Sequence, residues 1–397
     1  MKILLLAPHP FYQERGSPIA VNLLLRVLSA RGDTVDVLVY HEGEDIRLSN
    51  VSLYRVPAFP FVRRVPPGFS WKKLVCDTLM VFSAVRLVFR GRYDLVYSIE
   101  EAVFISVLIR WVAKIPYVYD MDSRLSEQLC EANIVFRPFR PIMRFFERIA
   151  IRNARMVVPV CDGLLSEEEL QSARKVVFLR DVSLLGDDDN ALHAEQTNLR
   201  SELGLESACL LMYVGNLQPY QGIDLLLEGF AVVAKIRPHA HLIIIGGEEL
   251  DISKYIDMAD RLNISGSVHF IGPRPIADLK HNLAQADILV SPRIQGNNTP
   301  MKLYSYLHSG TACLLTDLPT HRQVASDDIA LLVKPTPEAL CEGLLILIDD
   351  ESYRDRLAAA ARDFIEQNSS LDVFESTANE LFDWLQTEAT ADNRRLQ

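Results

Sequence analysis

The feature that most constrains the fold is a rhythm of short apolar runs separated by helical patterns, which occurs twice along the chain. Short continuous apolar runs are typical of parallel strands buried on both faces, and their alternation with helices is typical of a doubly wound sheet. We therefore predict an α/β protein with two Rossmann-like sheets. The expected strands are Ile3–Ala7, Val35–Val39, Leu95–Tyr97, Tyr117–Tyr119 and Val157–Val160, then Leu210–Val214, His241–Ile245, Val268–Phe270, Ile288–Val290, Ala312–Leu315 and Leu331–Val333.

The segment between the two series, Asp181 to Ser207, is polar and contains Gly186 followed by three aspartates. This composition favours a domain boundary. Residues 1–185 are predicted to form an N-terminal domain and residues 186–370 a C-terminal one, which a chain of 397 residues is long enough to support. Residues 371–397 are expected to form a closing helix, Leu371 to Leu385, and a polar tail that frays.

Composition excludes several classes of protein. The net charge of -11 argues against a general nucleic-acid binder, so any affinity for anions must be local. The six cysteines show neither C-x-x-C spacing nor a dense disulfide pattern, which fits a reducing cytoplasm. No apolar stretch reaches the roughly 20 residues of a membrane span, so we expect no transmembrane helix.

The first candidate site is the segment from Tyr213 to Gly222, which follows an expected strand and precedes the helical run Ile223 to Ile236. Gly215 permits a tight turn, and Gly222 leaves free backbone N–H groups at a positive helix end, where a phosphate is stabilised. The alternative is that both glycines serve only a strand-to-helix turn.

The second candidate is the segment from Ser291 to Lys302. Thr299 and Pro300 are predicted to be the N-cap and first residue of a helix ending at His308. Lys302 then falls in the first turn, where a cation opposes the helix dipole unless an anion lies between them. The alternative is a solvated lysine whose stem lies on the surface.

In the N-terminal half, Asp120-Met-Asp122 follows an expected strand and matches the Asp-x-Asp pattern of metal-dependent nucleotide-sugar enzymes. We interpret Asp122 as a cleft carboxylate and predict no metal site, because the second sheet is the better donor site. His9 is either a proton carrier near neutral pH or a structural histidine. Gly16 and Ser17, at the start of a helix, could hold polar groups of an acceptor.

A run of arginines is interleaved with phenylalanines in the same half. Such a basic and aromatic surface suits anionic lipid headgroups, although a charged helix face explains it equally well. The arginines are Arg137, Arg140, Arg144, Arg148, Arg152 and Arg155, and further basic pairs are Arg63-Arg64 and Lys72-Lys73.

In several places the chain resembles glycosyltransferase family 4 (glycosyl transferases group 1), retaining enzymes of the GT-B fold that use nucleotide-diphosphate sugars. The resemblance covers almost the whole chain. It rests on Gly16-Ser17, on Tyr213 to Gly222 before Ile223 to Phe230, on Gly246-Gly247, on Phe270 to Gly272, on Ala286-Asp287 before Ile288 to Pro292, and on Ser309-Gly310.

The chain also departs from this family. Asn216 and Gln221 stand where members usually carry an arginine and a lysine that clasp the diphosphate, and Asn297 and Ser305 stand where they carry two glutamates. Asp122 replaces a usual histidine. Either Lys302, with Arg293 or Arg274, supplies the missing positive charge, or donor binding has been lost.

The resemblance implies two Rossmann-like domains facing across a cleft, and a metal-independent, hexosyltransferase-like enzyme of polysaccharide biosynthesis. It would move a sugar, with retention of configuration, to a saccharide or lipid-linked acceptor. The alternatives are a catalytically silent companion subunit and a nucleotide-sugar epimerase of the same fold. No cofactor, metal or nucleic acid is expected, and the predicted location is cytoplasmic, peripheral on an anionic inner membrane face.

The resemblance and the motifs together assign the site residues. Asp122 and His9 are expected to be catalytic, and Gly16 and Ser17 to bind the acceptor. The expected donor-binding residues are Gly215, Asn216, Gln221, Gly222, Gly272, Arg274, Arg293, Asn297, Asn298, Thr299, Pro300, Met301, Lys302 and Ser305.

Overall fold

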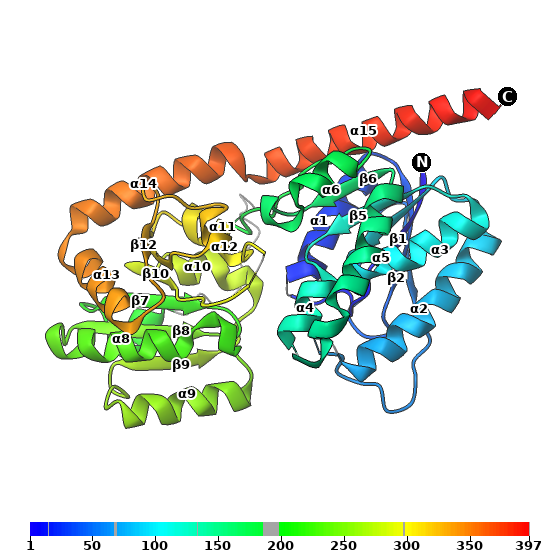
Figure 1. Ribbon diagram of the computed structural model, residues 1–397. Helices are drawn as coiled ribbons and strands as arrows, with labels where there is room; N and C mark the ends of the chain where they lie inside the picture. Colours follow the sequence, from blue (N-terminus) through cyan, green and yellow to red (C-terminus); the bar gives the residue numbers. More distant parts are fainter. Residues whose placement is uncertain (15, 67–69, 133, 186–197, 297, 397) are drawn as a thin grey trace. The chain divides into compact units, whose positions relative to one another are not determined.

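The computed structural model describes residues 1–14, 16–66, 70–132, 134–185, 198–296 and 298–396 (Figure 1). The chain divides into two compact units. Unit 1 comprises Met1–Arg180 and Phe374–Gln397, and unit 2 comprises Asp181–Val373. The last part of the chain therefore returns to the first unit, so unit 1 is assembled from both ends of the sequence.

Unit 1 is built on a six-stranded parallel sheet with the strand order β3-β2-β1-β4-β5-β6. In this order the chain reverses its direction of progress between β1 and β4, and ligands of such sheets bind outside the carboxyl ends of the strands at that point. The strands are β1 (Lys2–Leu6), β2 (Thr34–Val39), β3 (Val51–Arg55), β4 (Leu95–Ile99), β5 (Tyr117–Met121) and β6 (Met156–Pro159).

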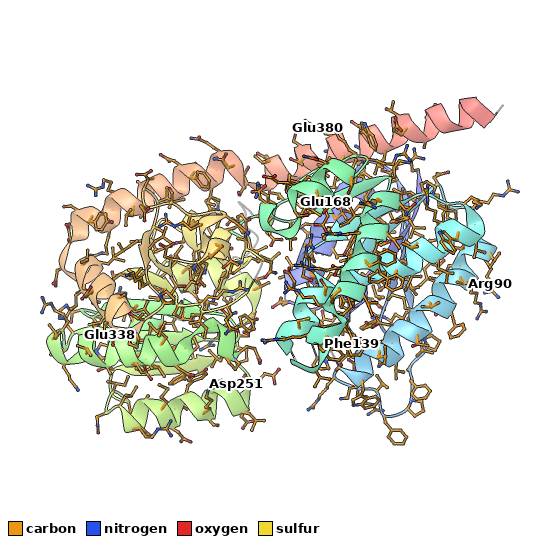
Figure 2. The ribbon with its side chains drawn as sticks, in the orientation of Figure 1. Arg90, Phe139, Glu168, Asp251, Glu338 and Glu380 are labelled. Carbon is orange, nitrogen blue, oxygen red and sulfur yellow. The ribbon has the colours of Figure 1, made fainter. Side chains whose placement is uncertain are left out.

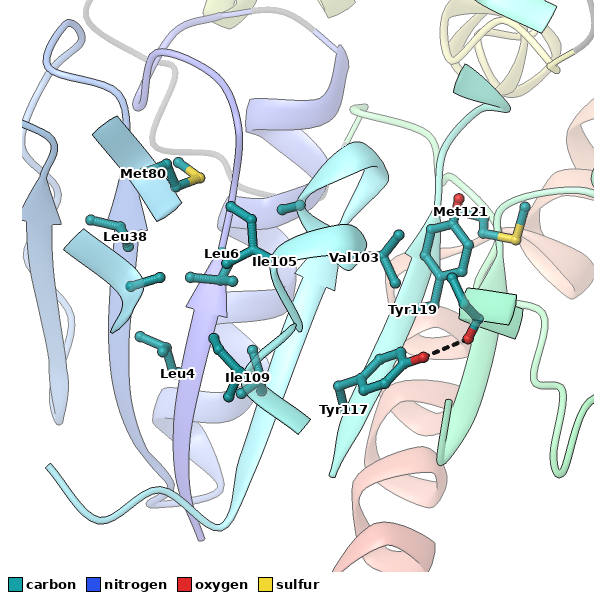
Figure 3. Close-up of a cluster of buried hydrophobic side chains, with 14 of the residues drawn as sticks. Leu4, Leu6, Leu38, Met80, Val103, Ile105, Ile109, Tyr117, Tyr119 and Met121 are labelled. Atoms are coloured by element: carbon teal, nitrogen blue, oxygen red, sulfur yellow. Dashed lines mark hydrogen bonds between the residues drawn. The ribbon is translucent and has the colours of Figure 1, made fainter. Parts of the chain in front are cut away.

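Helices cover both faces of this sheet. Leu4 and Leu6 of β1 pack with Met80 and Ile109 in one hydrophobic core, shown in Figure 3, which places α2, α3 and α5 on one face. In β4, which pairs with β1, the side chain of Tyr97 points to the opposite face of the sheet. Its ring centroid lies 5.8 Å from that of Phe382 in α15. The helices are α1 (Gly16–Ala30), α2 (Trp71–Arg90), η1 (Glu100–Ala102), α3 (Val103–Ala113), α4 (Leu125–Ala132), η2 (Ile134–Phe139), α5 (Arg140–Asn153), η3 (Asp162–Leu164), α6 (Glu167–Ser172) and α15 (Leu371–Leu396).

Unit 2 repeats the same architecture, with the parallel order β12-β11-β10-β7-β8-β9. Its point of reversal lies between β7 and β10. The strands are β7 (Cys209–Val214), β8 (Ala240–Ile245), β9 (Val268–Gly272), β10 (Ile288–Ser291), β11 (Ala312–Thr316) and β12 (Leu331–Val333).

Side chains along β7 alternate between two cores. Leu211 and Tyr213 belong to the core beneath α8 and α13, whereas Leu210 and Met212 belong to the core beneath α11 and α14, as the two-residue period of a strand requires. The helices are α7 (Leu199–Leu203), η5 (Pro219–Gln221), α8 (Ile223–Ile236), α9 (Glu249–Arg261), η6 (Ile276–Asp278), α10 (Leu279–Leu283), α11 (Lys302–His308), α12 (Pro319–Arg322), α13 (Pro337–Asp349) and α14 (Glu351–Asn368).

All eleven strands expected from the sequence are confirmed within a few residues at each end, and the helix Ile223–Ile236 is found as predicted. One strand was missed. In β3 exposed and half-buried residues alternate, because this strand lies at the edge of the sheet, so it carries no continuous apolar run.

The closing helix is longer than the predicted range Leu371 to Leu385. Helix α15 continues to Leu396, because the tail contains alanine, glutamate and arginine, which favour a helix. Thr387 and Thr390 support it by donating their hydroxyl protons to the carbonyl oxygens of Asp383 and Gln386. In the described part of the chain, no helix is long and apolar enough to cross a bilayer.

Candidate anion-binding site

The loop after β7 and the segment after β10 approach each other at the point of reversal in unit 2. Gly222 has a φ of 72°, and a Cβ atom there would collide with the carbonyl oxygen of Pro292. The backbone N–H of Ile294 donates to the carbonyl oxygen of Tyr220 at 2.9 Å. Only glycine permits this approach, so Gly222 joins the two segments as well as beginning α8.

Lys302 reaches into this junction from the first turn of α11. Its ammonium donates to Gln221 Oε1 at 3.1 Å and lies 3.9 Å from the centroid of the Tyr213 ring. Burial lowers the pKa of Lys302 well below its usual value, and the nearby positive charge of Arg293 lowers it further. Among the described residues no carboxylate forms an ion pair with this lysine, so the arrangement favours an incoming anion.

Arg293 is the second cation of the site. Its guanidinium donates to the carbonyl oxygens of Gln295 and Asn298 and stacks over Tyr220, 5.4 Å from the ring centroid. Gly296 curves around it with a φ of 130°, where any Cβ atom would overlap the guanidinium. The loop therefore holds Arg293 in a fixed and buried position.

His321 is a buried residue of this site that sequence reasoning missed. Its Nδ1 lies 2.6 Å from the carbonyl oxygen of Thr316, and its Nε2 lies 3.3 Å from the Ser291 hydroxyl. Burial lowers its pKa to about 4, and the charges of Lys302 and Arg293 act in the same direction. The imidazole is therefore neutral near pH 7. Its position shortly after an expected strand was the only signal that could have identified it.

The predicted beginning of α11 is wrong. The helix starts at Lys302, with Met301 as its cap, and not at Pro300. Thr299 does not cap it, and its hydroxyl donates to Gln323 Oε1 at 2.5 Å. The helix is two residues shorter than expected.

The other predicted donor residues of unit 2 are distributed unevenly. Asn216 lies in the loop, where its Oδ1 accepts from Gln221 Nε2 at 3.3 Å, and Asn298 holds Arg293. Gly272 ends β9, and Arg274 is exposed beyond it. Asn297 lies outside the described residues.

Ser305 lies on the buried side of α11. Its hydroxyl oxygen accepts a hydrogen bond from the backbone N–H of Leu184 at 3.0 Å. The side chain therefore holds the segment that enters unit 2 against this helix.

The predicted residues of unit 1 also lie at carboxyl ends of strands. Asp122 follows β5 and is half-buried. The pKa of the buried Tyr97 is raised by burial first, and then by the charges of Asp120 and Asp122. His9 follows β1, with Nδ1 3.2 Å from the carbonyl oxygen of Pro10. Gly16 and Ser17 form the first turn of α1.

Unit 1 also contains a cluster of half-buried acids that sequence reasoning missed. Glu101 forms an ion pair with Lys73 at 2.5 Å, and Asp77 accepts a hydrogen bond from Tyr40. Burial, together with the charges of Glu100 and Asp77, raises the pKa of Glu101 to about 7 although Lys73 opposes the shift. Two acids shortly after the expected strand Leu95–Tyr97 were the available signal. No group of three potential metal ligands occurs among the described residues.

The chain is similar in part to several glycosyltransferases. Residues 195–364 match the family described as Glycosyl transferases group 1. A D-inositol 3-phosphate glycosyltransferase of Corynebacterium glutamicum is 28% identical over 172 residues, 41% of this chain and 40% of that protein. The chain thus spans about two fifths of the length of the first curated relatives that it matches. An uncharacterized glycosyltransferase of Methanocaldococcus jannaschii is 18% identical over 83% of both chains.

Solved structures resemble the whole chain. A sucrose-phosphate synthase from Thermosynechococcus elongatus superposes with a TM-score of 0.80 at 16% identity, covering 98% of this chain and 99% of that one. HepE of Anabaena, solved with UDP-glucose, gives a TM-score of 0.72 at 17% identity over 96% and 99%. At these identities the likeness shows the fold alone, and it confirms the predicted GT-B architecture of two Rossmann-like domains.

Proposed function

We propose that the protein is a glycosyltransferase whose unit 2 binds the diphosphate of a nucleotide-sugar donor between Lys302, Arg293 and the beginning of α8. The observation that carries this proposal is a pair of cations, the buried Arg293 and the half-buried Lys302, at the reversal point of a doubly wound sheet, where such folds bind ligands. The group 1 match supports it, because residues 195–364 include both cations.

The chemistry follows from the charges. When the bond between sugar and diphosphate breaks, negative charge develops on the departing phosphate, and fixed cations in a partly buried site stabilise it. Lys302 supplies a point charge. Arg293, held by its loop, supplies a charge that needs no reorganisation. The N–H groups at the start of α8 add a partial positive charge, because Gly222 caps this helix without a side chain.

The amides at positions 216 and 221 fit this arrangement. Gln221 accepts a hydrogen bond from Lys302 and donates one to Asn216, so it orients the lysine without neutralising it. A basic residue at position 221 would add a third cation beside two whose charges already repel. Lys302 therefore replaces the basic pair that the family usually carries in this loop.

Unit 1 is assigned to the acceptor in this proposal. Asp122 and His9 are polar side chains at the carboxyl ends of β5 and β1, the two strands that flank β4, and Gly16 with Ser17 opens α1, the helix that follows His9 in the chain. The acceptor class is a saccharide or a lipid-linked saccharide. The proposal includes retention of configuration, which rests on the family resemblance. It also includes independence of metal ions, because the two cations can stabilise the diphosphate without one.

The rival proposal is a binding subunit without turnover. The hydroxyl oxygen of Ser305, which stands where the family carries a glutamate, is engaged by the backbone of Leu184. That observation favours loss of a donor contact. The two proposals differ in one measurable property, since the enzyme must transfer or hydrolyse the sugar and the subunit must not.

The test is calorimetric titration of the protein with UDP, GDP and ADP, and with the matching nucleosides. Lys302→Ala is expected to weaken nucleoside-diphosphate binding by roughly ten- to a hundredfold, the size of one charge-assisted contact. Nucleoside affinity should not change. Affinity for the diphosphate should also fall as pH rises, because a lysine with a lowered pKa loses its charge early.

Lys254→Ala is the matched control, because this lysine lies on α9 of the same unit and pairs with Asp224 on the surface. Unchanged diphosphate binding in Lys302→Ala, with a loss in Arg293→Ala, would show that the site exists but that the wrong cation was named. Absence of binding in the parent protein would refute the donor site. Binding without transfer or hydrolysis of any nucleotide sugar would favour the subunit.

A further inference from the structure

Helix α2 of unit 1 is apolar on its outer side as well as on its inner side. Cys76, Met80, Ala84 and Val88, spaced four residues apart, face the core. The opposite stripe contains Trp71, Leu74, Phe82 and Phe89, with Phe82 70% and Phe89 71% exposed. A surface helix of a globular protein normally carries polar residues there.

Helix α3 lies beside α2, and α5 lies beside α3. Because α2, α3 and α5 pack on one face of the sheet through a common core, their outer sides all point away from that face. We name the exposed apolar residues of these helices and of the preceding η2 the aromatic face. Its members are Trp71, Leu74, Phe82, Phe89, Leu108, Trp111, Val112, Val135, Phe139, Ile142, Phe145 and Phe146.

The helices of the aromatic face carry many more cations than carboxylates. Within residues 71–90, 103–114 and 135–153 the only acids are Asp77 and Glu147. Asp77 accepts a hydrogen bond from Tyr40, and Glu147 is buried and accepts from Ser126. This is notable in a chain with a net charge of -11.

Basic residues border the apolar ones. Within the described residues, Arg86 and Arg90 of α2, Arg110 and Lys114 near the end of α3, and Arg137 of η2 form no ion pair. The arginines of α5 are paired: Arg140 and Arg144 with Glu127, and Arg148 and Arg152 with Glu168. Figure 2 shows Arg90 and Phe139 at the surface of unit 1. The face therefore combines exposed aromatic rings with uncompensated positive charge.

We infer that the aromatic face binds peripherally to a lipid bilayer that contains anionic lipid. Tryptophan and phenylalanine bury their rings at the boundary between headgroups and acyl chains, and arginine and lysine contact the phosphates. The complementary partner must be apolar and negatively charged over a wide area. A helix of 20 residues such as α2 is about 30 Å long, which suits an extended surface. This inference does not depend on the proposed glycosyl transfer.

The test is flotation of the full chain with vesicles of phosphatidylcholine alone and with added phosphatidylglycerol. Binding is expected only to the anionic vesicles, weakening as salt is raised. The variant Phe82→Ser/Phe89→Ser should reduce binding by at least tenfold, because two exposed rings no longer enter the bilayer. Arg86→Gln/Arg90→Gln should reduce it about tenfold and flatten the salt dependence.

Val232→Ser/Ile236→Ser is the matched control. These residues form an exposed apolar pair on α8 of unit 2, so the substitution removes apolar surface outside the aromatic face and should leave vesicle binding unchanged. All substituted side chains are exposed, and the melting temperature of each variant confirms that it folds.

Tryptophan fluorescence provides a second readout. Two of the three tryptophans, Trp71 and Trp111, belong to the aromatic face, and the third, Trp384, is half-buried beside Lys175. In Trp384→Phe, anionic vesicles should shift the emission to shorter wavelength, and brominated lipid should quench it.

Three outcomes would overturn the inference. The first is absence of binding to anionic vesicles, and the second is binding that the phenylalanine and arginine variants leave unchanged. The third is a concentration-dependent dimer, abolished by Phe82→Ser/Phe89→Ser, without vesicle binding, because the face would then cover a second copy of the chain.

Discussion

The two sheets have the same strand order, yet the residues at their reversal points carry opposite charge. In unit 1 the strand β4 is followed by Glu100 and Glu101, with Asp77 beside them. In unit 2 the strand β10 is followed by Arg293 and then Lys302. The strand order determines where a ligand can bind, and the side chains after the strands determine which charge it must have.

Both reversal points hold a half-buried ionisable group whose pKa is shifted by burial. The pKa of Glu101 is raised to about 7, and that of Lys302 is lowered. A diphosphate would favour the charged form of the lysine. At the acidic site Lys73 already pairs with Glu101, and a hydroxyl group would add a further hydrogen-bond donor. The comparison agrees with the proposal that the leaving group binds unit 2 and the hydroxyl-bearing acceptor binds unit 1.

The largest effect is expected at the carboxyl end of β5. Asp122→Ala should lower the rate of sugar transfer by roughly ten- to a thousandfold, the effect of losing one acid-base or hydrogen-bonding group. Donor affinity and melting temperature should stay close to those of the parent, because the donor is assigned to unit 2. Steady-state kinetics with calorimetry separates the two effects.

Asp94→Asn is the control for Asp122, because Asp94 lies just before β4, at the amino edge of the same sheet, where it accepts a hydrogen bond from the backbone of Lys2. A fully active Asp122→Ala variant would show that Asp122 has no catalytic role. Weaker donor binding in that variant would contradict the assignment of the donor to unit 2 and of the acceptor to unit 1.

The next effect concerns the junction in unit 2. Gly222→Ala should destabilise the protein by about 2–4 kcal/mol, since a Cβ atom must adopt a left-handed φ and also displaces the Pro292 carbonyl. Gly204→Ala has a similar φ of 66° with no atom within 4 Å of its Cβ, so it should lose only about 1 kcal/mol. Urea unfolding measures both, and equal losses would mean that the close approach contributes nothing.

The smallest effect is a pH dependence that arises in unit 1. Because the pKa of Glu101 is raised from 4.5 to about 7, the folded protein binds an extra proton between these values. Its free energy of unfolding should fall as pH rises from 5 to 8, by roughly 1–3 kcal/mol from this group. Glu101→Gln should lack this contribution, whereas the exposed Glu338→Gln should keep it. An identical slope in parent and Glu101→Gln would contradict the prediction.

The sequence was most informative where neighbours along the chain determine the structure. Buried central strands such as β7 were found because apolar runs indicate burial on both faces. The edge strand β3 was missed, because its alternation of half-buried and exposed residues indicates a strand only when the strand that pairs with it, β2, is known. Lys302, which the sequence singled out, lies at the junction, and the helix that carries it begins two residues later than predicted. Its role in binding stays a prediction.

His321 and Glu101 show why part of the site could not be predicted. Each acquires its shifted pKa from burial and from charges that belong to other segments: His321 from Lys302 and Arg293, and Glu101 from Asp77. Because these interacting residues are far apart in the sequence, no local pattern indicates that they come together. The contact between Gly222 and Pro292 is of the same kind.

By itself, the sequence determined the two series of strands, the glycine positions and the segments rich in basic and aromatic residues, because these depend on residue type and local period. Tertiary structure decided the rest. It placed Lys302 beside Gln221, buried Glu101 against Lys73, and turned Phe82 and Phe89 outward on α2. The physical reason is that burial and electrostatic environment are properties of packed neighbours, which come together only when distant segments fold onto one sheet.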